Sequence, residues 1–277
     1  MKVGCHVSIR SGYLAAAQYA KKMGARCFQF FPKNPRSLKI KVFDEKDTQD
    51  CAVYCKKEEL VSIAHAPYPV NLSEVDKELR KAVCLSLVND LEIVESCGGI
   101  GLVVHFGKYR DKDPLEGYKL MIEMLNEVLL NWRGQAFLLI ENNAGQGVRM
   151  GTTLEELVQV RNLTDRKEKI GFCLDTCHAF ASDLWNGTNW GKVVERGKEL
   201  DFFTHLKAVH LNDSAYDHGS FRDRHANIGK GFIGEVAMRT FLHSEKLKGL
   251  PFILETPQSQ DYTHANEIKY VLSLNES

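Results

Sequence analysis

The sequence predicts one (β/α)8 barrel, a TIM barrel, that spans residues 1–277 as a single domain. Three observations support this prediction: short β-rich runs recur along the chain, amphipathic segments separate them, and polar residues close most of the runs. The chain is longer than the roughly 100–200 residues of a usual domain, but α/β barrels of this size fold as one unit. No Gly/Ser-rich linker, charge block or low-complexity tract divides the sequence.

Eight runs rich in β-branched and apolar residues are the candidate strands. They cover residues 3–6, 27–30, 61–65, 102–105, 137–141, 171–175, 206–211 and 252–255. Helical segments lie between consecutive runs, and this alternation is typical of βαβ units around a parallel sheet. Periodicity alone also allows a doubly wound open sheet, but eight such units close most economically into a barrel. The longest irregular stretch, 212–234, has a length that usually serves function.

Several intervening segments carry signals for a helix start or for a buried helix face. Residues 80–96 place apolar side chains at helical spacing, namely Cys84, Leu87, Val88, Leu91 and Val94. Asp113 followed by Pro114 is typical of an N-cap and a first helical residue. The apolar stripe expected after that start consists of Leu115, Tyr118, Ile122, Leu125 and Leu129. Thr153 and Glu156 have the spacing of a capping box for a further helix.

Charge, targeting signals and cysteine content indicate which partners and which cellular compartment the chain suits. The chain has 36 Lys and Arg against 36 Asp and Glu, so any contact with a polyanionic partner would depend on local basic patches. We find no signal peptide and no run of ~18 apolar residues, and expect a cytoplasmic protein that is neither secreted nor membrane-bound. The eight cysteines are expected to be reduced, mainly buried thiols. Cys51-x3-Cys55 and Cys173-x3-Cys177 lack the partner pairs of a structural zinc site.

Polar residues close six of the candidate strands. In a barrel the carboxyl ends of the strands form one rim, and active sites are built there. The side chains expected at this rim are His65, His105, Glu141, Asp175, His178, His210 and Glu255, together with Asp223 and His225 from the loop after the seventh strand. No P-loop, G-x-S-x-G elbow or dinucleotide-binding G-x-G-x-x-G follows a strand, and Gly145-x-Gly147 is too short to count as one.

Convergence of these residues indicates metal ions. Alone, each histidine would more often be a hydrogen-bonded structural residue than a ligand. Nine such groups on one rim would repel one another or bury charge at high cost unless cations neutralised them. Five imidazoles with four carboxylates suit zinc, with manganese as a harder alternative, and exceed the needs of one tetrahedral site. Because clustered metal ions are suited to phosphoryl transfer, phosphodiester hydrolysis is the predicted chemistry.

The sequence resembles the endonuclease IV family of apurinic/apyrimidinic endonucleases in the order and spacing of six segments: HAPY, IENNAGQG, CLDTCHAFA, HLND, DRHANIGKG and ILET. The resemblance covers nearly the whole chain and implies three zinc ions. The implied ligands are His65, His105 and Glu141 for the first ion, Glu141, Asp175, His210 and Glu255 for the second, and His178, Asp223 and His225 for the third. Glu141, shared by two ions, is the implied catalytic residue, whereas His6 has no ligand role and is expected to support its neighbours.

The resemblance also implies an activity and a substrate. Enzymes of this family hydrolyse the phosphodiester bond 5′ to abasic sites in double-stranded DNA and leave 3′-hydroxyl and 5′-deoxyribose phosphate ends. A lesser 3′-phosphodiesterase activity on blocked 3′ ends and a monomeric protein are implied as well. Rim loops are expected to enter the minor groove, kink the duplex and fill the space left by a flipped nucleotide.

One rim loop, FFPKNPRSLKIK after the second candidate strand, is clearly basic. By resemblance, Arg36 would insert into the base stack, with Tyr68 as its partner there and Lys33 as a further DNA contact. On charge alone the same loop fits an ordinary solvated segment. The sequence departs from the usual family pattern in ASDLWNG and at Pro35, Leu38 and Pro69.

Two other interpretations are compatible with a barrel of this kind. A divalent-metal sugar isomerase of the xylose isomerase-like barrels would share the fold and its strand-end ligands, but would need only one or two metals. His178 and the DRH segment that contains Asp223 and His225 therefore favour the nuclease. A catalytically inert protein that binds metal or damaged DNA is the third interpretation, and the complete ligand set argues against it.

Overall fold

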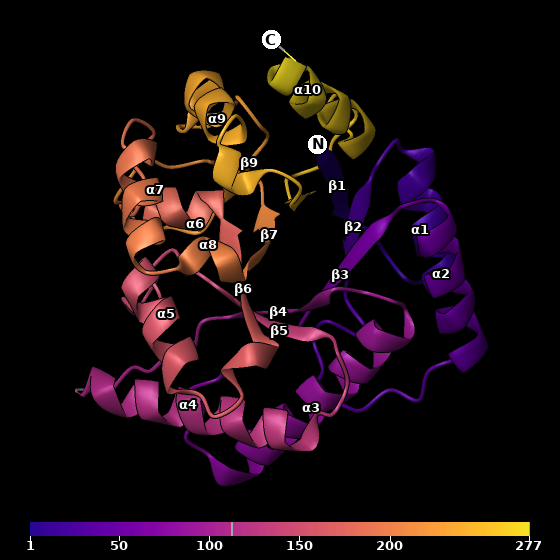
Figure 1. The fold of residues 1–277 in the computed structure, drawn as a ribbon, viewed down its shortest axis with the longest axis vertical. Coiled ribbons are helices and arrows are strands. Elements are labelled where there is room, and N and C mark those ends of the chain that lie inside the picture. Colours follow the sequence, from indigo (N-terminus) through magenta and orange to yellow (C-terminus); the bar gives the residue numbers. More distant parts are fainter. Residues whose placement is uncertain (112, 277) are drawn as a thin grey trace.

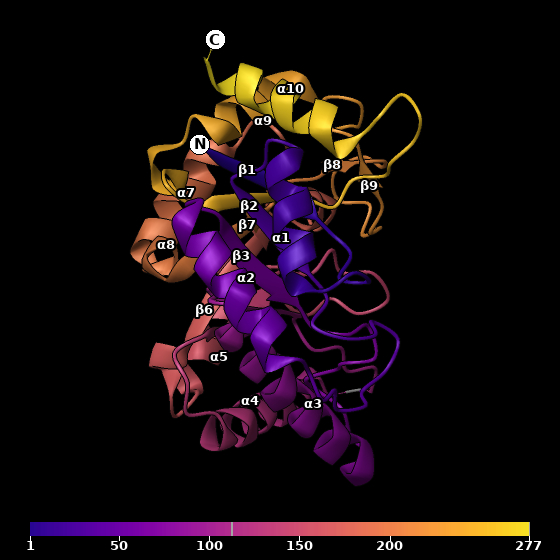
Figure 2. The ribbon, with the colours of Figure 1, turned by 90° about the vertical axis from the view of Figure 1, so that its right-hand side faces the viewer.

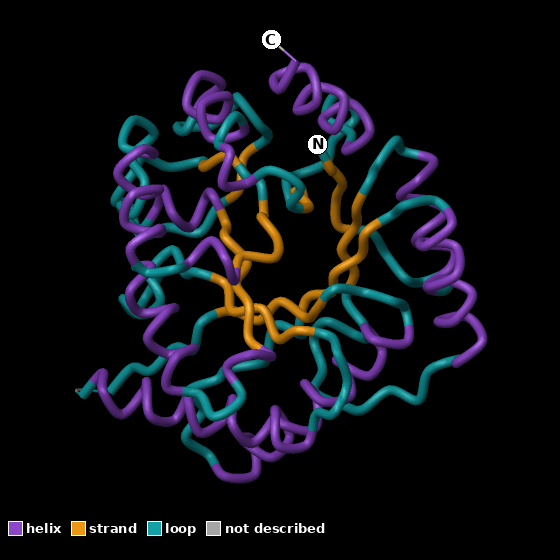
Figure 3. The backbone as a smooth tube through the Cα atoms, viewed as in Figure 1, coloured by secondary structure: helices purple, strands orange, loops and turns teal. Residues whose placement is uncertain are grey.

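The computed structural model describes residues 1–111 and 113–276. Eight parallel strands close into a barrel in the order β1-β10-β7-β6-β5-β4-β3-β2, so the predicted TIM barrel is confirmed over an open sheet (Figures 1 and 3). Each predicted strand is present, with ends that differ by at most one residue from those expected. The strands are β1 (Lys2–His6), β2 (Cys27–Phe30), β3 (Val61–His65), β4 (Gly101–His105), β5 (Phe137–Glu141), β6 (Ile170–Asp175), β7 (Leu206–His210) and β10 (Pro251–Leu254).

Helices surround the barrel, as the tube in Figure 3 shows. They are α1 (Tyr13–Lys22), α2 (Glu45–Lys57), α3 (Lys77–Ser96), α4 (Pro114–Asn131), α5 (Leu154–Leu163), α6 (Thr176–Ala181), α7 (Trp190–Glu199), α8 (Phe202–His205), α9 (Gly234–Leu242) and α10 (His264–Glu276), with short 3-10 turns η1 (Lys167–Lys169) and η2 (Glu245–Leu247). The stretch 212–234 was expected to be irregular. It contains a small antiparallel pair, β8 (Asp213–Ser214) with β9 (His225–Ala226), which lies on the side of the barrel where the long loops project (Figure 2).

The predicted helix starts are confirmed by their caps. The Asp113 carboxylate accepts a hydrogen bond from the Leu115 backbone N–H at 3.0 Å, and Thr153 with Glu156 forms the capping box. The stripe expected on α4 is partly wrong, because Leu115 is 64% exposed in the first turn. The buried face of α4 instead consists of Gly117, Met121, Met124, Leu125, Val128 and Leu129.

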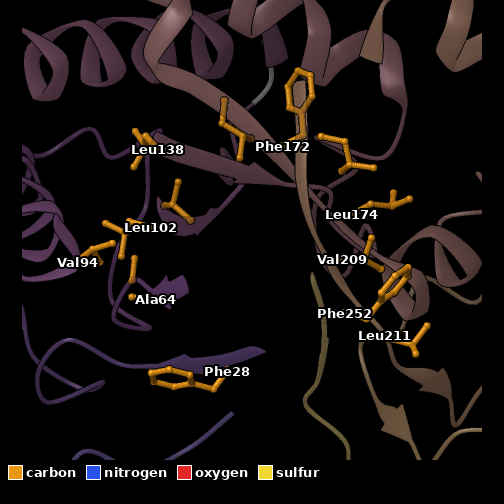
Figure 4. Close-up of a cluster of buried hydrophobic side chains, with 14 of the residues drawn as sticks. Phe28, Ala64, Val94, Leu102, Leu138, Phe172, Leu174, Val209, Leu211 and Phe252 are labelled. Atoms are coloured by element: carbon orange, nitrogen blue, oxygen red, sulfur yellow. The ribbon is translucent and has the colours of Figure 1, made fainter. Parts of the chain in front are cut away.

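The core has two layers, which follow from the alternation of side chains along each strand. Outward-facing residues such as Phe28, Leu138 and Phe172 pack against the helices (Figure 4). Inward-facing residues fill the barrel with one side chain from each of seven strands: Cys27, Ile63, Val103, Leu139, Cys173, Ala208 and Ile253. The eighth strand contributes Gly4, where any Cβ would lie 1.6 Å from the Cys27 carbonyl oxygen, so only glycine fits beside β2.

A polar ring lies one layer above this apolar plug. The residues two positions further along the same strands share its inward direction. They are His6, Gln29, His65, His105, Glu141, Asp175, His210 and Glu255. Strand alternation in a closed barrel thus delivers six of the nine expected ligands to one end of the barrel.

Two further sequence expectations concern the whole chain. All eight cysteines are free and buried, in agreement with the expected reduced thiols. No helix within residues 1–111 and 113–276 is both long enough and apolar enough to cross a membrane.

The apolar plug should be the main source of rigidity beneath the polar ring. We predict that Leu139→Ala lowers the free energy of unfolding by about 2–5 kcal/mol, because Leu139 is fully buried and the close-packed barrel cannot collapse around the cavity. Urea denaturation followed by circular dichroism measures the change. Leu163→Ala, at a position 57% exposed on α5, is the control and should change stability by less than ~0.5 kcal/mol. Equal effects of the two substitutions would contradict this account of the core.

Candidate metal centre

The expected ligands come together at the carboxyl end of the barrel in three overlapping sets. Within each set, the donor atoms all lie within 4.8 Å of one another. The sets are His65, His105 and Glu141; Glu141, Asp175, His210 and Glu255; and His178, Asp223 and His225. All nine residues expected from the sequence are therefore brought together.

Glu141 lies between the first two sets, and its two carboxylate oxygens face different partners. Oε2 is 3.4 Å from His65 Nε2 and 3.4 Å from His105 Nδ1. Oε1 is 2.8 Å from His210 Nδ1. Glu141 is 1% exposed, so its carboxylate faces these imidazoles rather than water. This geometry allows one carboxylate to serve two metal ions.

Asp175 has the corresponding position between the second and third sets. Its Oδ2 lies 3.9 Å from His210 Nδ1 and 3.7 Å from His225 Nε2. The third set itself is held around Asp223, whose Oδ1 is 3.3 Å from His178 Nε2 and 3.5 Å from His225 Nε2. The three sets thus form one continuous cluster, with a carboxylate at each junction.

Hydrogen bonds on the far side of the imidazoles orient them toward the cluster. His65 Nδ1 is 2.7 Å from the Ala66 carbonyl oxygen, and His178 Nδ1 is 2.8 Å from that of Asn142. Each ring then carries its proton on Nδ1 and directs Nε2 at the cluster. His210 is reversed, because its Nε2 is 2.7 Å from Gln29 Oε1 and its Nδ1 faces Glu141. Such outer partners select the tautomer that a metal requires.

Three amide side chains that the sequence analysis did not single out support the cluster. The Gln29 amide also donates to Glu255 Oε1 at 2.6 Å, so it holds two ligands at once. Asn142 exchanges hydrogen bonds with the Asp175 backbone, and Asn212 donates to Asp175 Oδ2 at 2.8 Å. Gln29 could have been predicted from the sequence. It lies two residues after Cys27, and each strand-end ligand candidate likewise lies two residues after an inward-facing residue of its own strand. His6 shares one hydrogen bond with Gln29 at 3.2 Å, which fits its expected supporting role.

The pKa directions in the cluster indicate an excess of negative charge that cations would balance. Burial lowers the pKa of His178, but Asp175 and Asp223 outweigh burial and raise it to about 10. Burial raises the pKa of Glu141, but His210 and His105 hold it well below its ordinary value. His105 itself is neutral at pH 7, because burial lowers its pKa to about 4. Without bound cations, a protonated imidazole would have to neutralise buried carboxylates.

The donor chemistry fits metal ions at these positions. Glu141 Oε2 and His225 Nε2 are buried and have no hydrogen-bond partner within the described part of the chain. Buried polar atoms are normally paired, so each lone pair directed into a set of donors suits a cation. Cys177 forms a further set with Asp175 and His225. Burial raises the pKa of its thiol, however, so the histidine and carboxylate donors are the better candidate ligands in this part of the cluster.

Comparison with known proteins agrees with this geometry. Residues 17–273 match the family described as the xylose isomerase-like TIM barrel. The probable endonuclease 4 of Symbiobacterium thermophilum is 44% identical to the chain over 274 residues, which cover 99% of each protein. The corresponding protein of Akkermansia muciniphila is 35% identical over 270 residues, or 97% of each. The chain belongs to the endonuclease IV family.

Solved structures place this family member among related barrels. Endonuclease IV from Thermus thermophilus superposes with a TM-score of 0.85 at 31% identity, over 100% of this chain and 99% of that one. A D-tagatose 3-epimerase-like protein, at 20% identity and a TM-score of 0.70, covers 99% of this chain and 96% of its own. The second similarity shows the shared barrel alone.

The rim loop after β2 lies beside Tyr68 in this endonuclease IV family member. The Tyr68 backbone N–H donates to the Pro35 carbonyl oxygen at 2.8 Å. Tyr68 is 64% exposed, and its ring packs edge-on against that of Phe31, with ring centres 5.2 Å apart. Arg36, next to Pro35, is also exposed. The structure therefore brings the loop that bears Arg36 beside Tyr68 on the rim of the candidate metal centre, and the unusual Pro35 supplies the carbonyl oxygen that Tyr68 contacts.

Lys33 does not have the position expected of a DNA contact. It is 5% exposed, and its ammonium group lies 2.9 Å from Asp90 Oδ1 and 2.9 Å from the Ser86 carbonyl oxygen, both on α3. Its charge is neutralised by a buried ion pair with Asp90, which fixes the loop after β2 to α3. The structure thus assigns Lys33 a structural role in place of the expected DNA contact. The sequence contained no sign of this, because Asp90 is 57 positions away along the chain.

A cleft of about 490 Å³ adjoins the candidate metal centre at His105. Its lining includes Tyr68, Asn71, Lys108 and Tyr109, from the loops after β3 and β4. A larger depression of about 1270 Å³ lies at the opposite end of the barrel, around the first residues of the strands. We associate function with the smaller cleft, because the candidate metal ligands lie at that end.

The Lys33–Asp90 pair makes a stability prediction. Asp90→Ala should lower the free energy of unfolding by about 3–5 kcal/mol, because it leaves the Lys33 charge buried without a partner. Burial raises the pKa of Asp90 to about 7 despite the attraction of Lys33, so urea unfolding should be measured at about pH 8, where the carboxyl is ionised. The double variant Lys33→Met/Asp90→Leu should recover most of the loss. No recovery in the double variant would contradict the buried-charge explanation.

Proposed function

We propose that this endonuclease IV family member hydrolyses the phosphodiester bond 5′ to abasic sites in double-stranded DNA, leaving 3′-hydroxyl and 5′-deoxyribose phosphate ends. The observation that carries the proposal is the continuous cluster of three donor sets joined at Glu141 and Asp175. A single-ion site would have no use for so many convergent ligands. The relatives named probable endonuclease 4 support the same activity.

We assign three zinc ions to the cluster, with manganese as a substitute at one or more positions. His65, His105 and Glu141 would hold the first, and Glu141, Asp175, His210 and Glu255 the second. His178, Asp223 and His225 would hold the third. When bound, the ions lower the pKa of water and neutralise the charge that develops on a phosphodiester during in-line displacement. The mixture of imidazole and carboxylate donors suits zinc better than magnesium or calcium.

The protein contributes to the reaction through preorganisation. Glu141 is the proposed catalytic residue, because its two oxygens face two donor sets and fix their separation. Gln29, Asn142 and Asn212 hold the ligands in place by hydrogen bonds that do not need to form during the reaction. Burial of Glu141, Asp175 and His210 keeps bulk water away from the centre of the cluster and strengthens the charge interactions there.

We further propose that the rim around the metal centre binds DNA. The net charge is zero, so attraction to phosphates must be local, and Arg36 is an exposed cation next to Tyr68. Arg36 and Tyr68 would enter the base stack of a kinked duplex, and the cleft beside His105 would receive part of a strand. The same site would also remove blocking groups from 3′ ends. The protein is expected to act as a monomer in the cytoplasm.

A divalent-metal sugar isomerase is the alternative. Glu141, Asp175, His210 and Glu255 alone would suffice for a one-ion isomerase, and related barrels include a protein named as epimerase-like. That function would leave the other five ligands without a role. Ketose–aldose interconversion without nicking of abasic DNA would favour it. A catalytically inert lesion-binding protein would bind abasic duplex with metal present but cleave nothing.

Purified protein is predicted to nick a duplex that contains one tetrahydrofuran abasic-site analogue and to carry three zinc ions per chain. Chelation should abolish nicking, and added zinc should restore it. Glu141→Gln should lower kcat by more than about 100-fold, because loss of even an outer partner of a metal ligand costs about 10–100-fold. Metal content by elemental analysis and gel assays of nicking provide the measurements. Full activity of metal-free protein would refute the proposal, and one ion per chain would favour the isomerase.

Arg36→Ala is predicted to raise KM for the tetrahydrofuran duplex by about tenfold with little change in kcat, because a contact to DNA worth about 1.4 kcal/mol is lost. Metal content should stay the same, since Arg36 contacts none of the donor sets. Steady-state kinetics at fixed salt measure the effect. Arg133→Ala, at an exposed site after α4, is the matched control and should behave as the unmodified protein. Equal kinetics for both variants would remove Arg36 from the DNA-binding surface.

A further inference from the structure

Asp223 differs from the other eight ligands in how it is held. The others lie at strand ends, on α6 or on β9, whereas Asp223 lies in the irregular segment between β8 and β9. Its side chain is 42% exposed, against 3% for His178 and 19% for His225 in the same set. A ligand on an exposed loop would lose conformational freedom on binding an ion, so any contact that already restrains the loop would favour binding.

The loop after β5 restrains the segment that bears Asp223. Gln146 Oε1 accepts a hydrogen bond from the Asp223 backbone N–H at 2.9 Å, across 77 positions of sequence. Gly145 and Gly147, on either side of Gln146, both have φ of 81°. This left-handed conformation suits glycine and turns the chain sharply on both sides of Gln146. The short Gly145-x-Gly147 motif, which has no meaning as a nucleotide-binding sequence, is explained as the turn that presents Gln146.

A second contact between the same two loops lies at Phe221. The Arg149 guanidinium lies 4.1 Å from the centre of the Phe221 ring. A Cβ at Gly145 would lie 2.6 Å from Phe221 Cδ1, so the absence of a side chain there makes room for the ring. The Phe221 backbone N–H also donates to the Ala181 carbonyl oxygen at the end of α6, at 2.9 Å. Phe221 and Asp223 are two residues apart, so both are restrained by the loop after β5.

We infer that Gln146 is a positioning residue, which holds the Asp223 backbone so that its carboxylate is ready for the third metal ion. Gly145, Arg149 and Phe221 complete this loop-to-loop contact. The inference rests on the proposed metal cluster and extends it, because it makes the affinity of one ion depend on a residue that contacts no ion. Preorganisation of Asp223 avoids an entropic cost at the moment of binding.

The test is zinc affinity measured by competition with a chromophoric chelator. In Gln146→Ala, one of the three ions should bind roughly 10-fold more weakly, the usual size of an effect from an outer partner of a ligand. The other two ions should keep their affinity, because neither set contains Asp223. Gln146→Glu should restore tight binding, since its carboxylate oxygen can accept the same hydrogen bond. Gln49→Ala, at an exposed position of α2, is the matched control and should bind all three ions as the unmodified protein does.

Each other outcome is informative. Unchanged affinity for all three ions in Gln146→Ala would overturn the inference, as would a raised KM for abasic duplex with unchanged zinc binding, which would make Gln146 a DNA contact. Only two ions in the unmodified protein would also overturn it, because no third ion would exist for Asp223. Failure of the unmodified, metal-loaded protein to nick abasic DNA would instead refute the proposed function.

Discussion

Along each barrel strand, side chains two residues apart point to the same side, and closure of the barrel converts this local rule into a ring. The inward positions hold a close-packed apolar plug, and the next inward positions hold His6, Gln29 and six metal-ligand candidates. The plug makes the polar ring possible, because it gives these side chains a rigid base and leaves them only one direction in which to point. The first two donor sets depend directly on this arrangement, and the third is built against it.

The ring concentrates charge that the protein alone does not neutralise well. Asp175 and Asp223 raise the pKa of His178 to about 10 despite its burial, and one buried oxygen of Glu141 has no hydrogen-bond partner among residues 1–111 and 113–276. In most cores such groups would be destabilising. Here the amide side chains of Gln29, Asn142 and Asn212 hold the ionisable groups in place by hydrogen bonds. Because amides carry no net charge, they orient these groups without competing for cations. The arrangement is unfavourable for an empty core and favourable for binding several divalent ions.

Loops complete the site in a different way from the strands. The loop that bears Arg36 is tied to α3 through the buried Lys33–Asp90 pair, and the loop that bears Asp223 is tied to the loop after β5 through Gln146. Both contacts join segments that are far apart in sequence. Loops make few contacts of their own. The ion pair at Lys33 and the hydrogen bond at Gln146 therefore decide whether an exposed side chain is already held in place or has to be ordered when a ligand binds. The candidate metal centre and the proposed DNA-binding surface are thus supported by separate parts of the molecule.

Strand positions, caps and the nine ligand candidates were predictable from the sequence, because they depend on local periodicity and on polar residues that close apolar runs. The role of Lys33 was not predictable from the sequence. Its charge is neutralised by Asp90, and the position of that residue relative to the loop depends on the packing of the whole barrel. The same reason applies to Leu115, whose exposure depends on how α4 is rotated against the barrel. Local sequence by itself determined which side chains each strand presents, and only the tertiary structure decided which of them meet, because burial and long-range pairing arise when the barrel closes.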